Sequence, residues 1–289
     1  MSWRTVVISN RCKLDLQSGY MLVRGENTKR IILDEISTIV IESTAVSLTA
    51  YLLAELTERK IKVIFCNNQR NPVAELSPIY GCHDCSQKIK MQMMWTEDIK
   101  RSVWTEIVTE KIRQQRSFLC DLGHIREAEL LQTYVNNVEY NDVTNREGHA
   151  AKVYFNAVFG MSFTRSEECV TNAALNYGYS LILSLINREV VGNGYLTQLG
   201  LFHASMFNFY NLSCDLMEPF RVIVDRCVYA KDFTLFETAE KHEIISLLDY
   251  PVRINGNTQR LQNAIKIYCH SVFDALNNND VALIKNYSL

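Results

Sequence analysis

Tyr80-Gly81-Cys82-His83-Asp84-Cys85, preceded by Pro72 and Pro78, marks the point where the pattern of the sequence changes. It is the one stretch of the chain with the chemistry of a linker, because proline and glycine interrupt regular structure. Before it, short β-branched or alternating segments predict strands, and after it apolar residues recur at helical spacing. The sequence therefore predicts an α+β fold of two domains, 1–78 and 87–289, joined by a linker at 79–86.

The first domain is predicted to be a small, β-sandwich-like unit that carries one helix. Turn residues, among them Ser18-Gly19 and Asn67-Asn68, separate short strand candidates. Between them, residues 47–56 place apolar side chains at helical spacing, with Ser47 as the expected N-cap. The strand candidates are residues 6–8, 13–16, 20–23, 30–33, 38–41 and 61–66. We expect two packed sheets around one core.

The second domain is predicted to be large and all-α. Its helices are expected at about 86–118, 124–139, 147–159, 170–189, 197–211, 214–229, 238–247 and 256–276. The segments 172–188 and 259–275 are apolar on more than one face, so they should be its central helices.

Composition predicts a folded globular protein. Of its 289 residues 47% are hydrophobic and 21% are charged, and no apolar run approaches the length of a membrane span. The segment 1–8 lacks the long apolar region of a secretory signal, so a cytoplasmic protein is expected. The nine cysteines should therefore be reduced. Cys82 and Cys85 are the only tight pair; zinc is an alternative there, but no second pair stands at finger spacing.

The overall charge is not that of a typical nucleic-acid-binding protein. The formal net charge is −2, although seven basic and four acidic side chains lie between residues 86 and 117. Such a run is either a solvated helix face or a local surface for phosphates.

Three polar clusters stand out in the apolar second half of the chain. They centre on Glu147, on His203, and on Asp215-Leu216-Met217-Glu218-Pro219-Phe220-Arg221. Each has an ordinary structural explanation. Glu147 can be an acid in the first turn of a helix that Asn145 caps, and His203 can be a core histidine whose hydrogen bonds are satisfied. The third cluster can be a capped helix start with a salt bridge.

Together the clusters predict a metal site. Asp215 and Glu218 are three residues apart and lie on one face of a helix, where two carboxylates repel unless a cation neutralises them. A neutral imidazole at His203 can also bind a metal. Carboxylates with one imidazole suit Mg²⁺ or Mn²⁺, and such an ion can act on a phosphodiester.

At these residues the sequence resembles the CRISPR-associated spacer integrases of bacterial adaptive immunity, and is closest to the subtype with a large single-protein effector nuclease (type II). The matching segments are residues 34–41, 61–67, Glu147-Gly148-His149-Ala150-Ala151-Lys152-Val153-Tyr154-Phe155, Asn172-Ala173-Ala174-Leu175-Asn176-Tyr177-Gly178-Tyr179, His203 and 215–221. Their order covers the whole chain.

The resemblance implies a metal-dependent DNA endonuclease and integrase that inserts new spacers when 3′-hydroxyl ends attack phosphodiesters of the repeat. It implies a homodimer, which we expect the domain 1–78 to form, and a small ferredoxin-like partner dimer, with other type II CRISPR proteins as possible partners. Double-stranded DNA, both protospacer and repeat, is the implied substrate.

Carried onto this sequence, the resemblance assigns the metal to Glu147, His203 and Glu218, with Asp215 as a further acid, either ligand or support. Arg146, Lys152 and Arg221 are candidate phosphate contacts because they lie nearby in the sequence. Two alternatives stay open: a structure-specific, metal-dependent nuclease on branched DNA, and a non-catalytic helical DNA-binding assembly protein.

Overall fold

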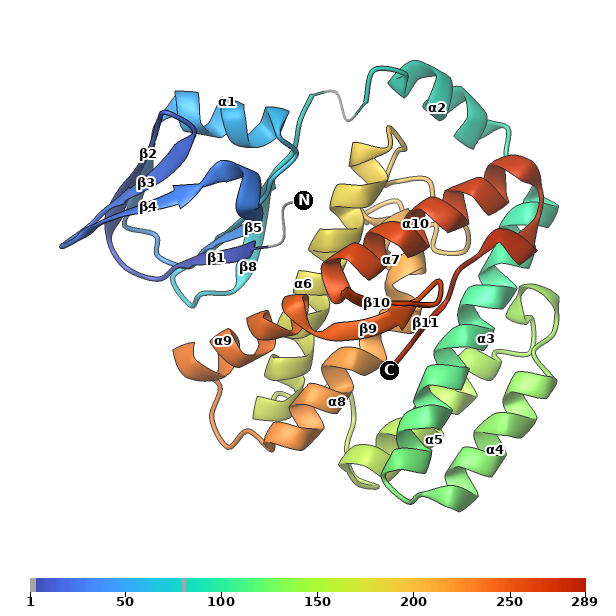
Figure 1. The fold of residues 1–289 in the computed structure, drawn as a ribbon. Coiled ribbons are helices and arrows are strands. Elements are labelled where there is room, and N and C mark those ends of the chain that lie inside the picture. Colours follow the sequence, from blue (N-terminus) through green and yellow to red (C-terminus); the bar gives the residue numbers. More distant parts are fainter. Residues whose placement is uncertain (1–3, 80–81) are drawn as a thin grey trace. The chain divides into compact units, whose positions relative to one another are not determined.

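The computed structural model describes residues 4–79 and 82–289, and the chain forms two compact units (Figure 1). Unit 1 comprises Met1–Cys85 with Val191–Gly194, and unit 2 comprises Ser86–Val190 and Tyr195–Leu289. The predicted domain limits, 1–78, 79–86 and 87–289, remain a prediction. Tyr80 and Gly81 of the predicted linker lie outside the described residues, as do Met1 to Trp3.

Unit 1 contains two four-stranded sheets, in the orders β1-β5-β7-β8 and β4-β3-β2-β6. The strands are β1 (Arg4–Ile8), β2 (Cys12–Gln17), β3 (Tyr20–Arg24), β4 (Thr28–Ile32), β5 (Ile36–Ile41), β6 (Val46–Leu48), β7 (Lys62–Cys66) and β8 (Pro72–Leu76). Strand β5 pairs in parallel with both β1 and β7 and is buried at every position, as the interior strand of a parallel sheet should be. Side chains of both sheets meet in one apolar core. The predicted β-rich beginning with two sheets is confirmed.

Two local predictions in unit 1 are wrong. Ser47 lies in β6, which pairs with β2, and the helix α1 (Ala50–Glu58) begins later with Thr49 as its N-cap. The Thr49 side chain accepts a hydrogen bond from the amide of Leu52 at 3.3 Å. Strand β8 begins at Pro72, a residue that the sequence analysis grouped with the linker. Proline is tolerated there because β8 is an edge strand.

Unit 2 is mainly helical. Its helices are α2 (Cys85–Met93), α3 (Glu97–Asp121), α4 (Ile125–Asn136), α5 (Arg146–Phe159), α6 (Val170–Gly192), α7 (Asn211–Met217), α8 (Arg221–Lys231), α9 (Thr238–Ser246) and α10 (Leu261–Asn278). The two predicted central helices correspond to α6 and α10, both of which bury most of their length. The single helix expected over 86–118 is instead two helices, because the side chain of Thr96 caps a new one, α3.

The prediction of an all-α second domain is wrong in one place. Strands β9 (Pro251–Ile254), β10 (Asn257–Arg260) and β11 (Tyr287–Ser288) form a three-stranded sheet in the order β10-β9-β11. Asn255 and Gly256 connect β9 to β10, both with positive φ. An Asn-Gly pair beside alternating residues is a strong hairpin signal, so the hairpin could have been read from the sequence.

The helix expected over 197–211 is also wrong, since α7 begins only at Asn211 and no helix covers residues 197–210. A buried carboxylate, that of Asp215, takes up backbone N–H groups in this stretch that a helix would have used internally. The result is a loop that carries His203.

Candidate functional site

Glu147 and Glu218 converge on one cation, the side chain of Lys111. The Lys111 Nζ lies 2.5 Å from Oε1 of Glu147 and 2.5 Å from Oε2 of Glu218. Lys111 comes from the middle of α3, Glu147 from the first turn of α5, and Glu218 from the short 3₁₀ turn Glu218–Phe220 that leads into α8. Three segments far apart in the sequence therefore place two carboxylates around one position that holds a positive charge.

The start of α5 fixes the backbone at Glu147. Asn145 adopts the left-handed conformation and its side chain accepts the Gly148 amide at 3.2 Å, as its predicted capping role requires. The Asp142 carboxylate adds a second cap that the sequence did not reveal, because it accepts the amides of Arg146 at 2.7 Å and Glu147 at 3.0 Å. These bonds satisfy N–H groups that have no partner inside the helix.

Glu218 is held by two cations at once. Besides Lys111, it binds Arg221, whose Nη2 and Nε lie 2.9 and 3.0 Å from Oε1. Burial opposes its charged form, but the charges of Lys111 and Arg221 outweigh burial and lower the pKa of Glu218 to about 2. Glu218 is therefore an ionised, buried carboxylate at neutral pH.

His203 is oriented by Asp215. The Nδ1 of His203 lies 2.5 Å from Oδ1 of Asp215, which is itself fully buried. Asp215 also accepts the backbone amides of Leu201, Phe202 and His203, at 2.6, 3.2 and 3.1 Å. With its oxygens so occupied, Asp215 fixes the loop backbone at residues 201–203 and holds the His203 ring through Nδ1.

The same set of groups is coupled electrostatically. The hydrogen bond with Asp215 raises the pKa of His203, and the negative charges of Glu218 and Glu147 raise it further. Burial works against the ammonium of Lys111, yet those two carboxylates raise its pKa as well. The structure thus joins Glu147 and Glu218 through Lys111 and pairs His203 with Asp215, and the two glutamates lie near enough to His203 to act on its pKa.

The three predicted phosphate contacts differ in exposure and in the groups they touch. The side chain of Lys152 is exposed on α5. The Arg146 guanidinium lies over the ring of Tyr134, 5.6 Å from its centroid. Arg221 forms an ion pair with Glu218 and lies over the ring of Tyr179. Its charge is therefore already balanced by a carboxylate of the protein.

Within residues 4–79 and 82–289, no group of three or more His, Cys, Asp and Glu side chains is arranged to hold a metal ion as it stands. At the site just described, Lys111 takes the position between the two glutamates. At the Cys82–Cys85 pair, burial first and then hydrogen bonds raise the pKa of Cys82 to about 12, so its free thiol is neutral at physiological pH.

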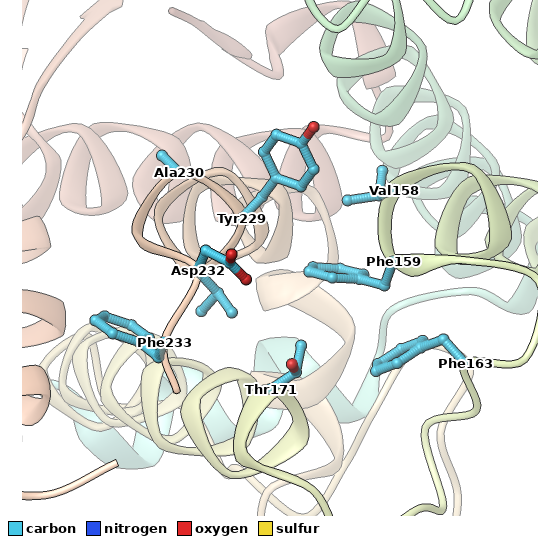
Figure 2. A pocket seen from close by; sticks show the side chains of 9 residues that line it. Val158, Phe159, Phe163, Thr171, Tyr229, Ala230, Asp232 and Phe233 are labelled. Atoms are coloured by element: carbon cyan, nitrogen blue, oxygen red, sulfur yellow. The ribbon is translucent and has the colours of Figure 1, made fainter. Parts of the chain in front are cut away.

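A separate hollow of about 450 Å³ lies between α5, α6 and α8. It is lined mainly by aromatic and aliphatic side chains, and Figure 2 shows Phe159 and Asp232 pointing toward each other across it. Phe159 and Tyr229 lie 12 and 11 residues beyond Glu147 and Glu218, so the hollow is near the opposite ends of α5 and α8. It contains a carboxylate and no basic side chain, so it does not suit a phosphate.

No described helix is long and apolar enough to cross a membrane.

Comparison with known sequences finds one family along most of the chain. Residues 5–232 match the family model described as CRISPR associated protein Cas1. A CRISPR-associated endonuclease Cas1 of Neisseria meningitidis serogroup C (strain 8013) is 35% identical over 229 residues, which are 79% of this chain and 75% of that protein. A second such endonuclease, from Francisella tularensis subsp. novicida (strain U112), is 26% identical over 286 residues, covering 88% and 89% of the two chains.

Solved structures share the fold. A casposase bound to an integration product has a TM-score of 0.77 at 16% identity, with 97% of this chain and 93% of that one covered. A Cas1 protein from Thermotoga maritima has a TM-score of 0.72 at 16% identity, with 94% and 97% covered. A Cas6-RT-Cas1–Cas2 complex matches with a TM-score of 0.73 at 16% identity, covering 97% of this chain and 36% of that chain.

Proposed function

The chain belongs to the CRISPR associated protein Cas1 family, and from that premise we propose that it is a metal-dependent DNA integrase and endonuclease that inserts spacers into a CRISPR array. We assign one divalent ion, Mg²⁺ or Mn²⁺, to Glu147, His203 and Glu218. The observation that carries this assignment is the Lys111 ammonium between the two glutamates, because it marks a place built for positive charge.

The side chains assigned to the ion are of the chemical types that such an ion binds. Two carboxylates and an imidazole suit Mn²⁺, and the carboxylates suit Mg²⁺. The His203–Asp215 pair has the form of a carboxylate–histidine–metal arrangement, in which the carboxylate fixes the ring and its tautomer. We therefore place Asp215 behind the histidine as a positioning residue, and we place Arg221 behind Glu218 in the same role.

When bound, a divalent ion would lower the pKa of an incoming 3′-hydroxyl and offset the charge that develops on the phosphate. In the joining step the incoming 3′-hydroxyl gives up its proton and its oxygen forms a new bond to phosphorus, while the bond from phosphorus to the leaving 3′-oxygen of the repeat breaks and that oxygen takes up a proton. Glu147 and Glu218 supply the negative charge of the site. Asp215 keeps the ring of His203 in one orientation throughout.

The assembly we propose is a homodimer that works with a small ferredoxin-like partner dimer on double-stranded DNA, with other type II CRISPR proteins as further partners. A Cas1–Cas2 complex among the structural neighbours supports the pairing with a second CRISPR protein. The modest net charge implies that contacts with phosphates are local or are supplied by the assembly.

The test is a strand-transfer assay with the partner, divalent metal, a short duplex with free 3′-hydroxyls and a plasmid that carries the repeat. Loss of supporting groups around a metal already costs 10- to 100-fold, so Glu147→Gln should reduce joined product by about 100-fold or more. Glu127→Gln is the matched control, since Glu127 is likewise a half-buried first-turn acid, on α4.

Equal activity of Glu147→Gln and the wild-type protein would contradict the assignment. Cleavage of branched DNA without any joined product would favour the structure-specific nuclease instead. Binding without either product, in the presence of metal and partner, would favour the non-catalytic assembly protein.

A further inference from the structure

The hollow between α5, α6 and α8 lies within unit 2 and takes no part in the proposed metal site. Phe159 and Phe163 lie beside each other there, with ring centroids 5.0 Å apart, and the ring of Tyr229 lies 6.4 Å from that of Phe159. Asp232 points toward Phe159 from the other side (Figure 2). The hollow therefore combines aromatic rings with one carboxylate.

Two helices end at this hollow. Helix α5 ends at Phe159, and α8 ends at Lys231 with Asp232 as its C-cap. The last four carbonyls of a helix have no partner inside it, and that end of the helix dipole is negative. One helix start contributes in the opposite sense, since Thr171 is the second residue of α6. Two helix ends and a carboxylate outweigh it, and no basic side chain lines the hollow, so the hollow attracts cations.

The charge of Asp232 is not explained by its place in the fold. Asp232 has a left-handed backbone with φ 44°, where Gly or Asn is the usual residue after a helix. The helix dipole also disfavours a negative charge at this end. The neighbouring Lys231 pairs with Glu243 at 2.5 Å, and no cation within residues 4–79 and 82–289 forms an ion pair with Asp232. A charge of opposite sign therefore has to come from outside the chain.

The side chain of a lysine or arginine matches these features. Its cation can lie over aromatic rings, whose faces attract positive charge. Its apolar stem can lie against Val158 and Val228, which also line the hollow. The Asp232 carboxylate can accept a charge-assisted hydrogen bond from it. A wholly apolar ligand would leave that carboxylate unmatched.

The rim of the hollow indicates where such a side chain comes from. Tyr229 is 41% exposed, and Ala230 and Asp232 are exposed as well. A small molecule is usually held with most of its surface buried, and a free amine would be poorly enclosed here. A side chain presented by a protein is enclosed by the contacts around it. We infer that the hollow is a docking site for a lysine or arginine side chain of a protein partner.

The probe is Nα-acetyl-lysine N-methylamide, which carries the lysine side chain without terminal charges. Methyl NMR spectra of the full chain with ¹³C-labelled valine report its binding, because Val158 and Val228 line the hollow. A ligand of this size should bind with a Kd of about 1–10 mM. The Nε-acetylated form has the same stem and no charge, and it should bind about 10-fold more weakly.

Asp232→Asn should weaken binding of the lysine derivative about 10-fold and remove its advantage over the acetylated form. The variant should keep its Tm, because Asn suits the left-handed backbone and removes a charge that the helix dipole disfavours. Tyr229→Leu keeps an apolar side chain and should weaken binding about 2- to 5-fold. Glu58→Gln is the control, since it removes an exposed acid from the last residue of α1 in unit 1, and it should leave binding unchanged.

Equal binding of the lysine derivative and its acetylated form would overturn the inference, and so would equal binding by the wild-type and Asp232→Asn proteins. Spermidine that binds through Asp232 much more tightly than the lysine derivative would assign the hollow to free polyamines and overturn the protein source. Glu147→Gln should bind the lysine derivative as the wild type does, because the hollow does not depend on the metal site. The docking site and the proposed function therefore fail separately.

Discussion

Lys111 lies on the apolar side of α3, between Val108 and Ile112, and only 8% of it is exposed. In the sequence it is one of seven basic side chains between 86 and 117, where a solvated helix face or a phosphate surface are the natural interpretations. Its position among the apolar residues of the helix was the one indication in the sequence that Lys111 is buried. A buried lysine needs a partner of opposite charge. The partners, Glu147 and Glu218, could not be predicted because they depend on how three distant helical segments pack.

Lys111→Met should destabilise the metal-free protein and strengthen its binding of Mn²⁺. Removing one partner of a buried ion pair costs about 3–5 kcal/mol, because the remaining charges are left uncompensated. A divalent ion would restore that compensation without having to displace an ammonium. Thermal unfolding with and without Mn²⁺ should therefore show a lower metal-free Tm and a larger metal-induced rise than in the wild type.

The matched control is Lys100→Met, which removes an exposed pair with Glu97 on the same helix and should change Tm little. A Lys111→Met protein with unchanged metal-free Tm and unchanged response to Mn²⁺ would show that Lys111 does not occupy the cation position.

The start of α5 is the element whose geometry sets the direction of Glu147. The sequence predicted the Asn145 cap and the first-turn place of Glu147, because both follow from local capping preferences. The sequence did not predict that Asp142 accepts the amides of Arg146 and Glu147, since this depends on a left-handed turn at Asn141 and Asp142. It also predicted a helix where the His203 loop lies, because the competing acceptor, Asp215, is encoded twelve residues later.

Asp142→Ala should cost about 1 kcal/mol of stability, the usual value for a lost cap, and should also reduce strand transfer. Thr96→Ala removes a cap of the same kind from α3, far along that helix from Lys111. Chemical denaturation should show a similar loss of unfolding free energy for the two variants. In the integration assay, Asp142→Ala should join DNA more slowly than Thr96→Ala. Equal activity of the two would mean that the capped start of α5 does not position Glu147.

Across the whole molecule, the change from strands to helices was predictable because it follows from side-chain periodicity. Unit 1 with its two sheets and helices α6 and α10 are confirmed on that basis. The sheet of unit 2 was missed although its Asn255-Gly256 turn is visible in the sequence, and its third strand, β11, comes from the distant end of the chain. The resemblance assigned Glu147, His203, Asp215 and Glu218 to one site. Of the two cations that hold Glu218, Arg221 is a local partner three residues along the chain, whereas Lys111 emerges only from packing.

The most direct test of the metal assignment is anomalous diffraction from crystals of the wild-type chain soaked with Mn²⁺. The account predicts one strong peak within about 2 Å of carboxylate oxygens of Glu147 and Glu218 and of Nε2 of His203, with the Lys111 ammonium displaced from between the glutamates. A peak at other residues, or bound Mn²⁺ with Lys111 still bridging Glu147 and Glu218, would contradict it.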